Sequence, residues 1–230
     1  MFVTLDKFRN LFQNVKRTLI DGTRYYIVED AKVQYPSVTS VISWVNRKKW
    51  ADWQSKVGLE EANRKRKHST TRGTNFHTLT EVYLKNEDYK SCKEYQVPLV
   101  NLMFNSAKKE LDNRISNIQL QEETMYSHKI CLAGTVDLIC DFDGELAVVD
   151  FKTAEKTKPE EWLEDYFVQL SAYWAMFSEK TGKAPKKLVV FLVAENGDVQ
   201  VVERTNIMDY LNTLQDYVTQ FVQHRDATIK

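Results

Sequence analysis

The sequence predicts an α/β protein with a mixed central sheet flanked by helices and a helical N-terminal extension. Five β-prone runs support the sheet, at residues 118–128, 130–142, 145–153, 187–194 and 198–204. Apolar residues at helical spacing lie before, between and after these runs, at residues 73–85, 99–115, 160–180 and 207–224. The chain has 230 residues, 43% hydrophobic and 28% charged, a size and composition that suit one soluble globular core. We therefore expect one domain over residues 1–230.

The N-terminal part, residues 1–72, is expected to hold a hairpin followed by basic helices. Asp21-Gly22 is a two-residue turn signal between two short β-prone runs. Ser37 is placed to cap a helix, because an apolar series at helical spacing begins at the next residue. We expect the basic stretch that follows to be helical in parts, with a flexible segment at residues 67–71. Residues 73–204 then form the core, and residues 205–230 form a closing helix.

The charges balance overall but segregate along the chain. Basic and acidic residues number 32 each, so any nucleic-acid binding must come from a local patch. Residues 47–72 contain nine basic and three acidic residues, and residues 141–165 reverse that ratio. The first region could hold phosphates or be an ordinary solvated face, and the second could hold cations. The candidate phosphate-binding residues are Arg47, Lys48, Lys49, Arg64, Lys65, Arg66, Lys67 and Arg72.

Cysteine usage and the N-terminal sequence suggest a cellular compartment. Three cysteines without CxxC spacing argue against a disulfide framework and against a zinc ribbon. No apolar run approaches the roughly 20 residues needed to cross a bilayer, and the start lacks the apolar stretch of a secretory signal. We expect a cytoplasmic protein of a bacterial or phage-infected host cell, without a membrane partner. A weakly transit-like start leaves the mitochondrial matrix as the alternative.

The Asp143-Gly144 turn predicts the pairing of the two strands that it joins. A two-residue hairpin loop sets Phe142 opposite Glu145, and the same register sets Asp137 opposite Asp150. Directly opposed Cβ atoms on an antiparallel pair lie about 4.5–5.5 Å apart, where like charges are destabilising. A divalent cation between the two carboxylates would offset the repulsion, and oxygen ligands are those that Mg²⁺ and Mn²⁺ prefer.

Lys152 completes a catalytic pattern. Strand alternation puts its ammonium on the same face as both carboxylates. Phosphodiester hydrolysis needs a cation to polarise the phosphate and activate water, and a positive group to stabilise developing charge. The alternative is that Asp137 and Asp150 are solvated residues on an exposed strand. The catalytic interpretation is preferred because neighbouring residues make both strands apolar, and buried ionised Asp is rare unless paired: Leu138, Ile139, Val148 and Val149.

The ordered motifs resemble those of PD-(D/E)xK nucleases of the RecB-like exonuclease group. Gly134-Thr135-Val136-Asp137 resembles the GxxD motif of that group, and Asp150-Phe151-Lys152-Thr153 resembles its DxKT motif. Four further matches are the PSVT segment at residues 36–39, the GxxxH helix at residues 73–77, the acidic position Glu122, and the QxxxY pair Gln169 and Tyr173. The match spans residues 35–180. Within the group, the set is similar to the genome maintenance exonucleases of mitochondria and their phage and bacterial relatives.

The resemblance implies a restriction-endonuclease-like fold and a site for one or two Mg²⁺ or Mn²⁺ ions. Its metal ligands would be His77, Glu122, Asp137, Asp150 and the carbonyl of Phe151. Lys152, Gln169 and Tyr173 would join Asp137 and Asp150 as catalytic residues. Some relatives carry an iron–sulphur cluster on four cysteines, three of them after the core. This chain has no cysteine after Cys140, so we expect no such cluster.

Several supporting residues keep a second interpretation. His77 alone would more often be a structural histidine, and Glu81 could orient it or face solvent. Glu122 competes with Glu123, because neighbours on a strand point to opposite faces. Gln169 lies beside an apolar stripe and needs a polar partner, which DNA phosphate, the metal site or the Asp150 strand could supply.

We therefore expect a metal-dependent exonuclease that hydrolyses single-stranded DNA from an end, in DNA replication, recombination or repair. The basic stretch would hold phosphates, and its aromatic residues Trp44, Trp50 and Trp53 would either stack bases or belong to the core. The alternatives are a structure-specific endonuclease, a duplex-preferring exonuclease of the same fold, and an inactive DNA-binding or interaction module.

Overall fold

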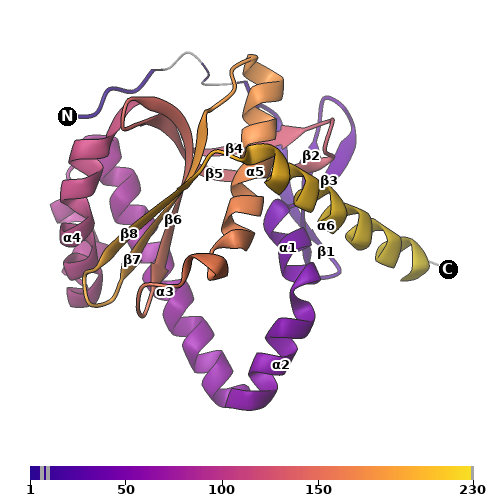
Figure 1. Cartoon of the computed structure of the whole chain (residues 1–230), viewed down its shortest axis with the longest axis horizontal. Helices are drawn as coiled ribbons and strands as arrows, with labels where there is room; N and C mark the ends of the chain where they lie inside the picture. Colours follow the sequence, from indigo (N-terminus) through magenta and orange to yellow (C-terminus); the bar gives the residue numbers. More distant parts are fainter. Residues whose placement is uncertain (6–7, 9–10, 229–230) are drawn as a thin grey trace.

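A five-stranded mixed sheet forms the centre of the molecule (Figure 1). The computed structural model describes residues 1–5, 8 and 11–228. The strands lie side by side in chain order: β4 (Ile115–Ser127), β5 (Leu132–Phe142), β6 (Glu145–Ala154), β7 (Lys187–Ala194) and β8 (Val199–Arg204). Neighbouring strands are antiparallel except β6 and β7, which are parallel. A parallel pair needs a crossover connection, which α5 (Glu164–Thr181) supplies. The predicted mixed sheet is confirmed.

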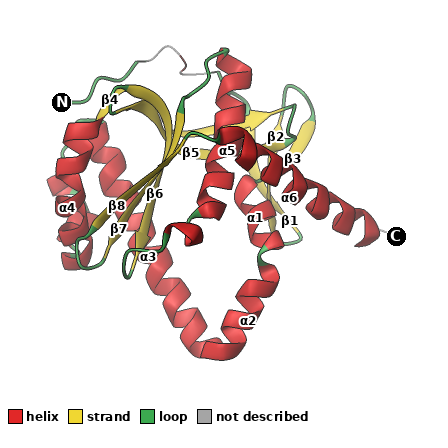
Figure 2. Ribbon diagram, viewed as in Figure 1, coloured by secondary structure: helices red, strands yellow, loops and turns green. Residues whose placement is uncertain are grey.

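Helices cover both faces of this sheet (Figure 2). The long α3 (Leu59–Leu84) and α4 (Pro98–Arg114) pack on one face, and α5, α6 (Ile207–Thr228) and α1 (Val38–Val45) cover the other. Apolar side chains of the strands alternate between these two layers: Leu138 and Cys140 join the α3–α4 side, whereas Ile139 and Val148 join the α5 side. The sheet is therefore buried on both faces. The helices predicted on either side of it are confirmed.

A second, three-stranded antiparallel sheet precedes α1. It consists of β1 (Val15–Ile20), β2 (Thr23–Val28) and β3 (Val33–Pro36). The hairpin predicted at Asp21-Gly22 is confirmed, and β3 is an additional strand. Ser37 caps α1 as predicted, because its Oγ accepts a hydrogen bond of 3.0 Å from the backbone N–H of Ser40. Ser37 also forms an isolated bridge to Ala133, which places this sheet beside the start of β5.

Helix α2 (Arg47–Val57) and the first half of α3 project from the sheet as a V, which we call the arch (residues 47–72; Figure 1). Gly58 joins its two limbs with φ +85°, a left-handed conformation that glycine adopts at little cost. All residues of α2 are described and none is buried. The α2 limb therefore contributes no side chain to the core.

The flexible segment predicted at residues 67–71 is wrong, because these residues lie inside the continuous helix α3. Serine and threonine have lower helix propensity than alanine or leucine, but tertiary contacts routinely override such small preferences. Here His68 and Arg72 both contact Glu195 beyond the end of β7. Those contacts fasten the lower half of α3 to the sheet.

The remaining predicted helices are confirmed with shifted ends. The helix expected from residue 160 begins at Glu164, after a 3-10 turn η4 (Glu160–Trp162), and two further 3-10 turns precede α4: η2 (Tyr89–Ser91) and η3 (Lys93–Gln96). Among the helices that the structure describes, none combines the length and apolar character required to cross a bilayer.

Candidate active site

Strands β5 and β6 part at the two central aspartates. Their pairing runs from Phe142↔Glu145 to Leu138↔Val149, as the turn predicts. Asp137 and Asp150 occupy the next positions but do not pair. Instead, Oδ2 of Asp137 accepts a hydrogen bond of 2.8 Å from the backbone N–H of Phe151. The predicted face-to-face pair is therefore wrong in detail: the register is right, but a carboxylate takes the place of a backbone partner where the strands diverge.

Asp150 is held from the α5 side of the sheet. Its side chain is 1% exposed, and Oδ1 accepts a hydrogen bond of 3.0 Å from Nε2 of Gln169. Oδ2 makes an ion pair with the Lys152 ammonium but receives no hydrogen bond of good geometry within the described part of the chain. The same ammonium lies 5.0 Å from the ring centroid of Tyr166. The sequence left DNA phosphate, the metal site and the Asp150 strand as possible polar partners of Gln169. In the structure its partner is Asp150.

Tyr173, one turn after Gln169, explains the glycine of the GxxD motif. A Cβ atom on Gly134 would lie 2.9 Å from Cε1 of Tyr173 and 3.1 Å from its hydroxyl, so only glycine fits without displacement. Tyr173 is 2% exposed. Burial, with Asp150 and Asp137 nearby, raises the pKa of its hydroxyl well above the usual value. The residue is a neutral, buried support beneath the start of β5.

Three ligand types meet on the α3 side. One atom each from His77 of α3, Glu122 of β4 and Asp137 of β5 lie within 4.8 Å of one another. Nδ1 of His77 is 3.8 Å from Oε1 of Glu122 and 3.7 Å from Oδ2 of Asp137. Nε2 of His77 lies 2.8 Å from the Phe151 carbonyl oxygen, which accepts a hydrogen bond from it. That bond fixes the ring with Nδ1 toward the carboxylates.

Backbone conformation distinguishes Glu122 from its neighbour. Glu122 lies between the pairs Gln121↔Leu138 and Glu123↔Val136, so it is level with Asp137, and its φ of +48° is in the left-handed region. This unusual conformation for a non-glycine residue is one that concentrates at functional sites. Glu81 does not orient His77, because its carboxylate pairs with Lys85 at 2.5 Å.

The pKa values of His77 and Asp150 are both raised, but for different reasons. Burial lowers the pKa of His77, but Asp137 and Glu122 outweigh it and raise the pKa to about 9. Burial raises the pKa of Asp150 to about 6, while the Lys152 charge opposes the rise. The pKa of Lys152 is raised, because the nearby carboxylates Asp150 and Asp137 outweigh the effect of burial. Lys152 therefore keeps its positive charge at neutral pH.

The donor set fits a hard divalent cation. Carboxylate oxygens with one imidazole suit Mg²⁺ or Mn²⁺, and a metal-binding histidine commonly donates its other ring N–H to a backbone carbonyl, as His77 does. The poorly satisfied Oδ2 of buried Asp150 is a further available oxygen. Asp150 lies outside the group of His77, Glu122 and Asp137, yet Asp137 is near enough to influence its pKa. The group can hold a cation whose charge would replace the imidazolium proton.

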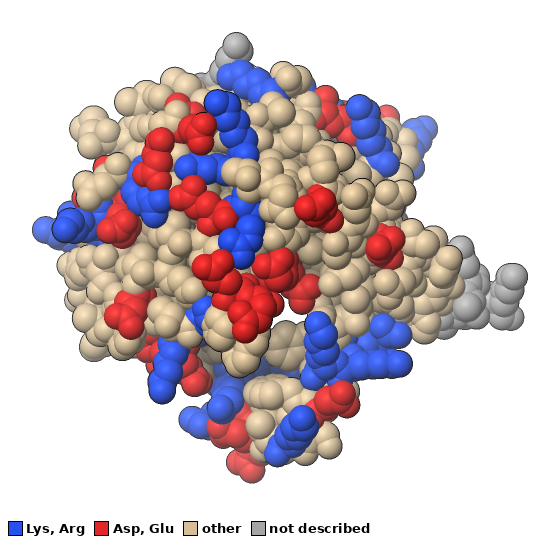
Figure 3. Space-filling view, viewed as in Figure 1, with Lys and Arg blue, Asp and Glu red and all other residues tan. Residues whose placement is uncertain are grey.

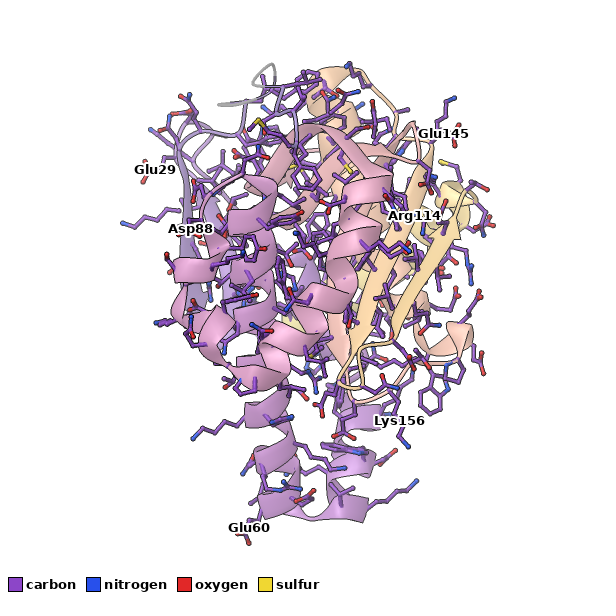
Figure 4. All side chains as sticks on the ribbon, turned by 90° about the vertical axis from the view of Figure 1, so that its left-hand side faces the viewer. Glu29, Glu60, Asp88, Arg114, Glu145 and Lys156 are labelled. Atoms are coloured by element: carbon purple, nitrogen blue, oxygen red, sulfur yellow. The ribbon has the colours of Figure 1, made fainter. Side chains whose placement is uncertain are left out.

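A hollow of about 760 Å³ adjoins this site between the arch and the end of β6. Its lining includes three tryptophans, Trp50, Trp53 and Trp162, together with Tyr166, and five cations, Lys65, Arg66, Arg72, Lys156 and Lys158. Tyr166 links it to the site, since its ring faces Lys152 and its hydroxyl accepts a hydrogen bond of 3.1 Å from Lys158. In Figure 3 the region is open through the molecule, with acidic residues above and Lys and Arg below. Figure 4 labels Glu60 at the tip of the arch and Lys156 above it.

The eight predicted phosphate-binding residues are not equivalent. Six are exposed on the arch: Arg47, Lys48, Lys49, Arg64, Arg66 and Lys67. Lys65 is half-buried and lines the hollow with Arg66, whereas Arg64 pairs with Glu61 at 2.7 Å. Arg72 is only 4% exposed, and its guanidinium is occupied by Thr153 and Glu195. Arg72 borders the hollow, but its guanidinium is committed to these protein acceptors.

The three tryptophans of the basic stretch lie in two different environments. Trp44 packs edge-to-face on Phe221, with the guanidinium of Arg47 3.8 Å from its ring centroid, so it belongs to the α1–α6 packing. Trp50 and Trp53 form a pair at the hollow, with ring centroids 6.2 Å apart. Trp162 and Lys158 were not anticipated from the sequence. Of the two partners of Arg72, Thr153 belongs to the DxKT motif and could have been suspected from the sequence. No sequence motif indicated Glu195.

The mixed sheet presents Asp137, Asp150 and Lys152 beside His77 and Glu122, so that a candidate cation site lies next to a fixed positive charge, as metal-dependent hydrolysis of a phosphodiester requires. The sequence profile of the PD-(D/E)XK nuclease superfamily matches residues 51–228, and the chain belongs to that superfamily. The predicted restriction-endonuclease-like fold is confirmed by this membership.

Individual relatives are distant. The chain is 23% identical over 171 residues to human mitochondrial genome maintenance exonuclease 1. The matched region covers 71% of this chain and 44% of that protein. The chain thus spans less than half the length of this curated relative. A solved structure of a candidate exonuclease from Eubacterium rectale is 11% identical, with a TM-score of 0.46 over 66% of this chain and 65% of the other.

Proposed function

We propose that this chain is a divalent-metal-dependent deoxyribonuclease that degrades single-stranded DNA from an end, in DNA replication, recombination or repair. Mg²⁺ or Mn²⁺ is the cation, and residues 1–230 act as one nuclease domain. The observation that carries the proposal is the hollow, which joins aromatic and basic side chains of the arch to Tyr166 and, through it, to Lys152. The exonuclease activity named in the human relative supports the same class of reaction.

The lining of the hollow favours a single strand. Tryptophan rings offer stacking surfaces for unpaired bases, and Lys65, Arg66, Lys156 and Lys158 offer charges to backbone phosphates. This combination binds strands with little dependence on sequence. Bases in a duplex are stacked on one another and are not free to stack on these rings, so a duplex would use the cations alone.

The arch supports entry from an end. Helices α2 and α3 are joined covalently at Gly58, and both limbs return to the body of the protein. A strand that runs beneath a closed arch must be threaded by a free end. A circular strand would have to open the arch first.

The side chains then divide the work of hydrolysis. A bound divalent cation supplies polarisation of the phosphate and a lowered pKa for the attacking water. Lys152 keeps its charge beside Asp150 and can stabilise the negative charge that develops on the phosphate oxygens. Gln169 fixes Asp150 through a hydrogen bond of 3.0 Å, and the Phe151 carbonyl fixes the His77 ring. Both groups are therefore oriented before substrate arrives.

The form of the substrate tests this proposal. Linear single-stranded DNA labelled at either end, the same strand as a closed circle, and a blunt duplex are each incubated with the protein and Mg²⁺ or Mn²⁺. We expect short products from the linear strand, slow cleavage of the duplex and an intact circle. Cleavage of the circle at the linear rate would overturn degradation from an end. Lack of metal-dependent product from every DNA would overturn the nuclease proposal.

A further inference from the structure

Arg72 lies on α3 opposite the end of β6, next to the residue that follows Lys152. We infer that Arg72 is a positioning residue for Lys152: it fastens the end of β6 to the arch and so fixes where the ammonium meets the phosphate. This inference rests on the proposed function. It also replaces the sequence-based expectation that Arg72 contacts the DNA backbone: the side chain borders the hollow but is only 4% exposed, and its guanidinium is held by Thr153 and Glu195.

The guanidinium of Arg72 has three protein acceptors. Nε donates to Oγ1 of Thr153 at 3.1 Å, and Nη2 donates to the Thr153 carbonyl at 3.2 Å. Nη1 makes an ion pair with Glu195. Glu195 is itself tied to β6, since its backbone N–H donates to the Ala154 carbonyl at 3.0 Å. One buried side chain therefore joins the arch, the end of β6 and the turn beyond β7.

The position matters because β5 has already left this edge of β6. Beyond Val149 the strand has lost its antiparallel neighbour, while β7 continues on the other edge to Ala154. Side chains take over the vacant edge: Asp137 accepts from the Phe151 N–H, His77 donates to the Phe151 carbonyl, and Arg72 donates to the Thr153 carbonyl. These contacts hold the residues on either side of Lys152.

Arginine is required for this arrangement by its shape. Its planar fork can serve Thr153 and Glu195 together, whereas lysine offers a single point charge. A displacement of about 1 Å in a catalytic group can reduce a rate roughly 100-fold. Loss of the Arg72 contacts should therefore reduce the turnover step rather than the binding of the strand.

The test compares Arg72→Lys and Arg72→Ala with Arg66→Ala, which removes an exposed cation from the same helix. Steady-state cleavage at saturating strand gives kcat, and fluorescence anisotropy with labelled single-stranded DNA and Ca²⁺ in place of Mg²⁺ gives Kd. We expect both Arg72 variants to lose roughly tenfold to 100-fold in kcat, with Kd changed less than about twofold. For Arg66→Ala the loss is expected in Kd.

Structural failure is distinguished by two further measurements. Glu195→Gln removes the negative charge that faces Arg72 but keeps an acceptor oxygen, and Thr153→Val removes the hydroxyl acceptor. Both leave Arg72 in place, and they should show smaller losses of kcat in the same direction. Hydrogen exchange at the Lys152, Thr153 and Ala154 amides should be faster in Arg72→Lys than in the wild type, with other strands unchanged. This readout needs no cleavage.

Two outcomes overturn the inference: a folded Arg72→Lys variant with wild-type kcat and weakened Kd, or unchanged exchange at the end of β6. Failure of the wild-type chain to cleave any DNA overturns the proposed function instead.

Discussion

Gln169 reaches from α5 into the sheet and donates a hydrogen bond of 3.0 Å to Oδ1 of Asp150. Asp150 is 1% exposed, and its burial raises its pKa to about 6. A buried carboxylate is costly unless donors satisfy it. Gln169 is the neutral donor, and Lys152 supplies the charged partner on the other oxygen.

Replacing Gln169 by leucine should therefore harm both stability and activity. The substitution keeps the approximate volume but leaves Oδ1 without its donor, which costs about 1–3 kcal/mol. Urea unfolding of Gln169→Leu measures that loss, and a cleavage assay measures the accompanying fall in rate. Unchanged stability would mean that the hydrogen bond contributes nothing to holding Asp150.

Two glycine-to-alanine changes are expected to have opposite signs. At Gly134 the new Cβ would meet Tyr173 at 2.9 Å, a clash inside a packed core that costs about 1–3 kcal/mol. At Gly73 the nearest atom would be Oγ1 of Thr153 at 3.6 Å, an ordinary contact. Because Gly73 lies within α3, alanine there should be neutral or stabilise by up to about 1 kcal/mol. Denaturation of both variants decides the matter; equal destabilisation would contradict it.

Metal binding should raise the melting temperature. A cation that binds only the folded chain stabilises it by about 2.7 kcal/mol at a concentration of 100 Kd. Thermal unfolding with increasing Mn²⁺ or Mg²⁺ should therefore show a saturable rise that a chelator reverses. Glu122→Gln should weaken the effect, because it removes one charged ligand from the group with His77 and Asp137.

Glu123→Gln is the matched control for that titration. Glu123 pairs with Val136 on β5 and lies outside the group of His77, Glu122 and Asp137. It should keep the metal-induced rise in melting temperature. An equal loss in the Glu122 and Glu123 variants would remove the assignment of Glu122 as a ligand.

The basic lining of the hollow should determine how single-stranded DNA binding depends on salt. Each lost phosphate contact on a single strand flattens the slope of log K against log salt by about 0.7. Lys65→Ala and Lys156→Ala should each do so, and Trp53→Ala should weaken binding by about 1–3 kcal/mol through lost stacking. Anisotropy across a salt series measures both quantities.

Lys186→Ala is the control for the salt series. Lys186 pairs with Glu145 at 3.3 Å, and Figure 4 shows Glu145 at the far end of the molecule from Lys156. Its removal should leave the slope unchanged. A slope that falls equally in all three lysine variants would indicate attraction by overall charge and no track in the hollow.

Local signals predicted most of the fold. The Asp143-Gly144 turn fixed the β5–β6 register as far as Leu138↔Val149, because a two-residue loop leaves one pairing. Strand alternation correctly put Asp150 and Lys152 on one face, where they pair. The helical spacing of Gln169 and Tyr173 likewise predicted their common side of α5.

The failures arose where distant contacts decide the conformation. The divergence of β5 and β6 depends on the Asp137 carboxylate capturing the Phe151 N–H, which no turn signal encodes. Residues 67–71 lie in a helix that Glu195, more than 120 residues away, contacts at His68 and Arg72, and the second contact accompanies the burial of Arg72. The hollow exists because the arch meets the end of β6, so its lining comes from segments that are separate in the sequence.

Metal-dependent hydrolysis of an end-labelled single strand by the wild type, Asp150→Asn and Lys152→Met tests the central claim most directly. The experiment uses saturating enzyme and Mg²⁺ or Mn²⁺, and each variant is first shown to be folded by its melting curve. The account predicts product from the wild type that a chelator abolishes, and rates lower by roughly 100-fold or more in both variants. Wild-type rates in a folded Lys152→Met variant, or cleavage that persists without divalent metal, would contradict it.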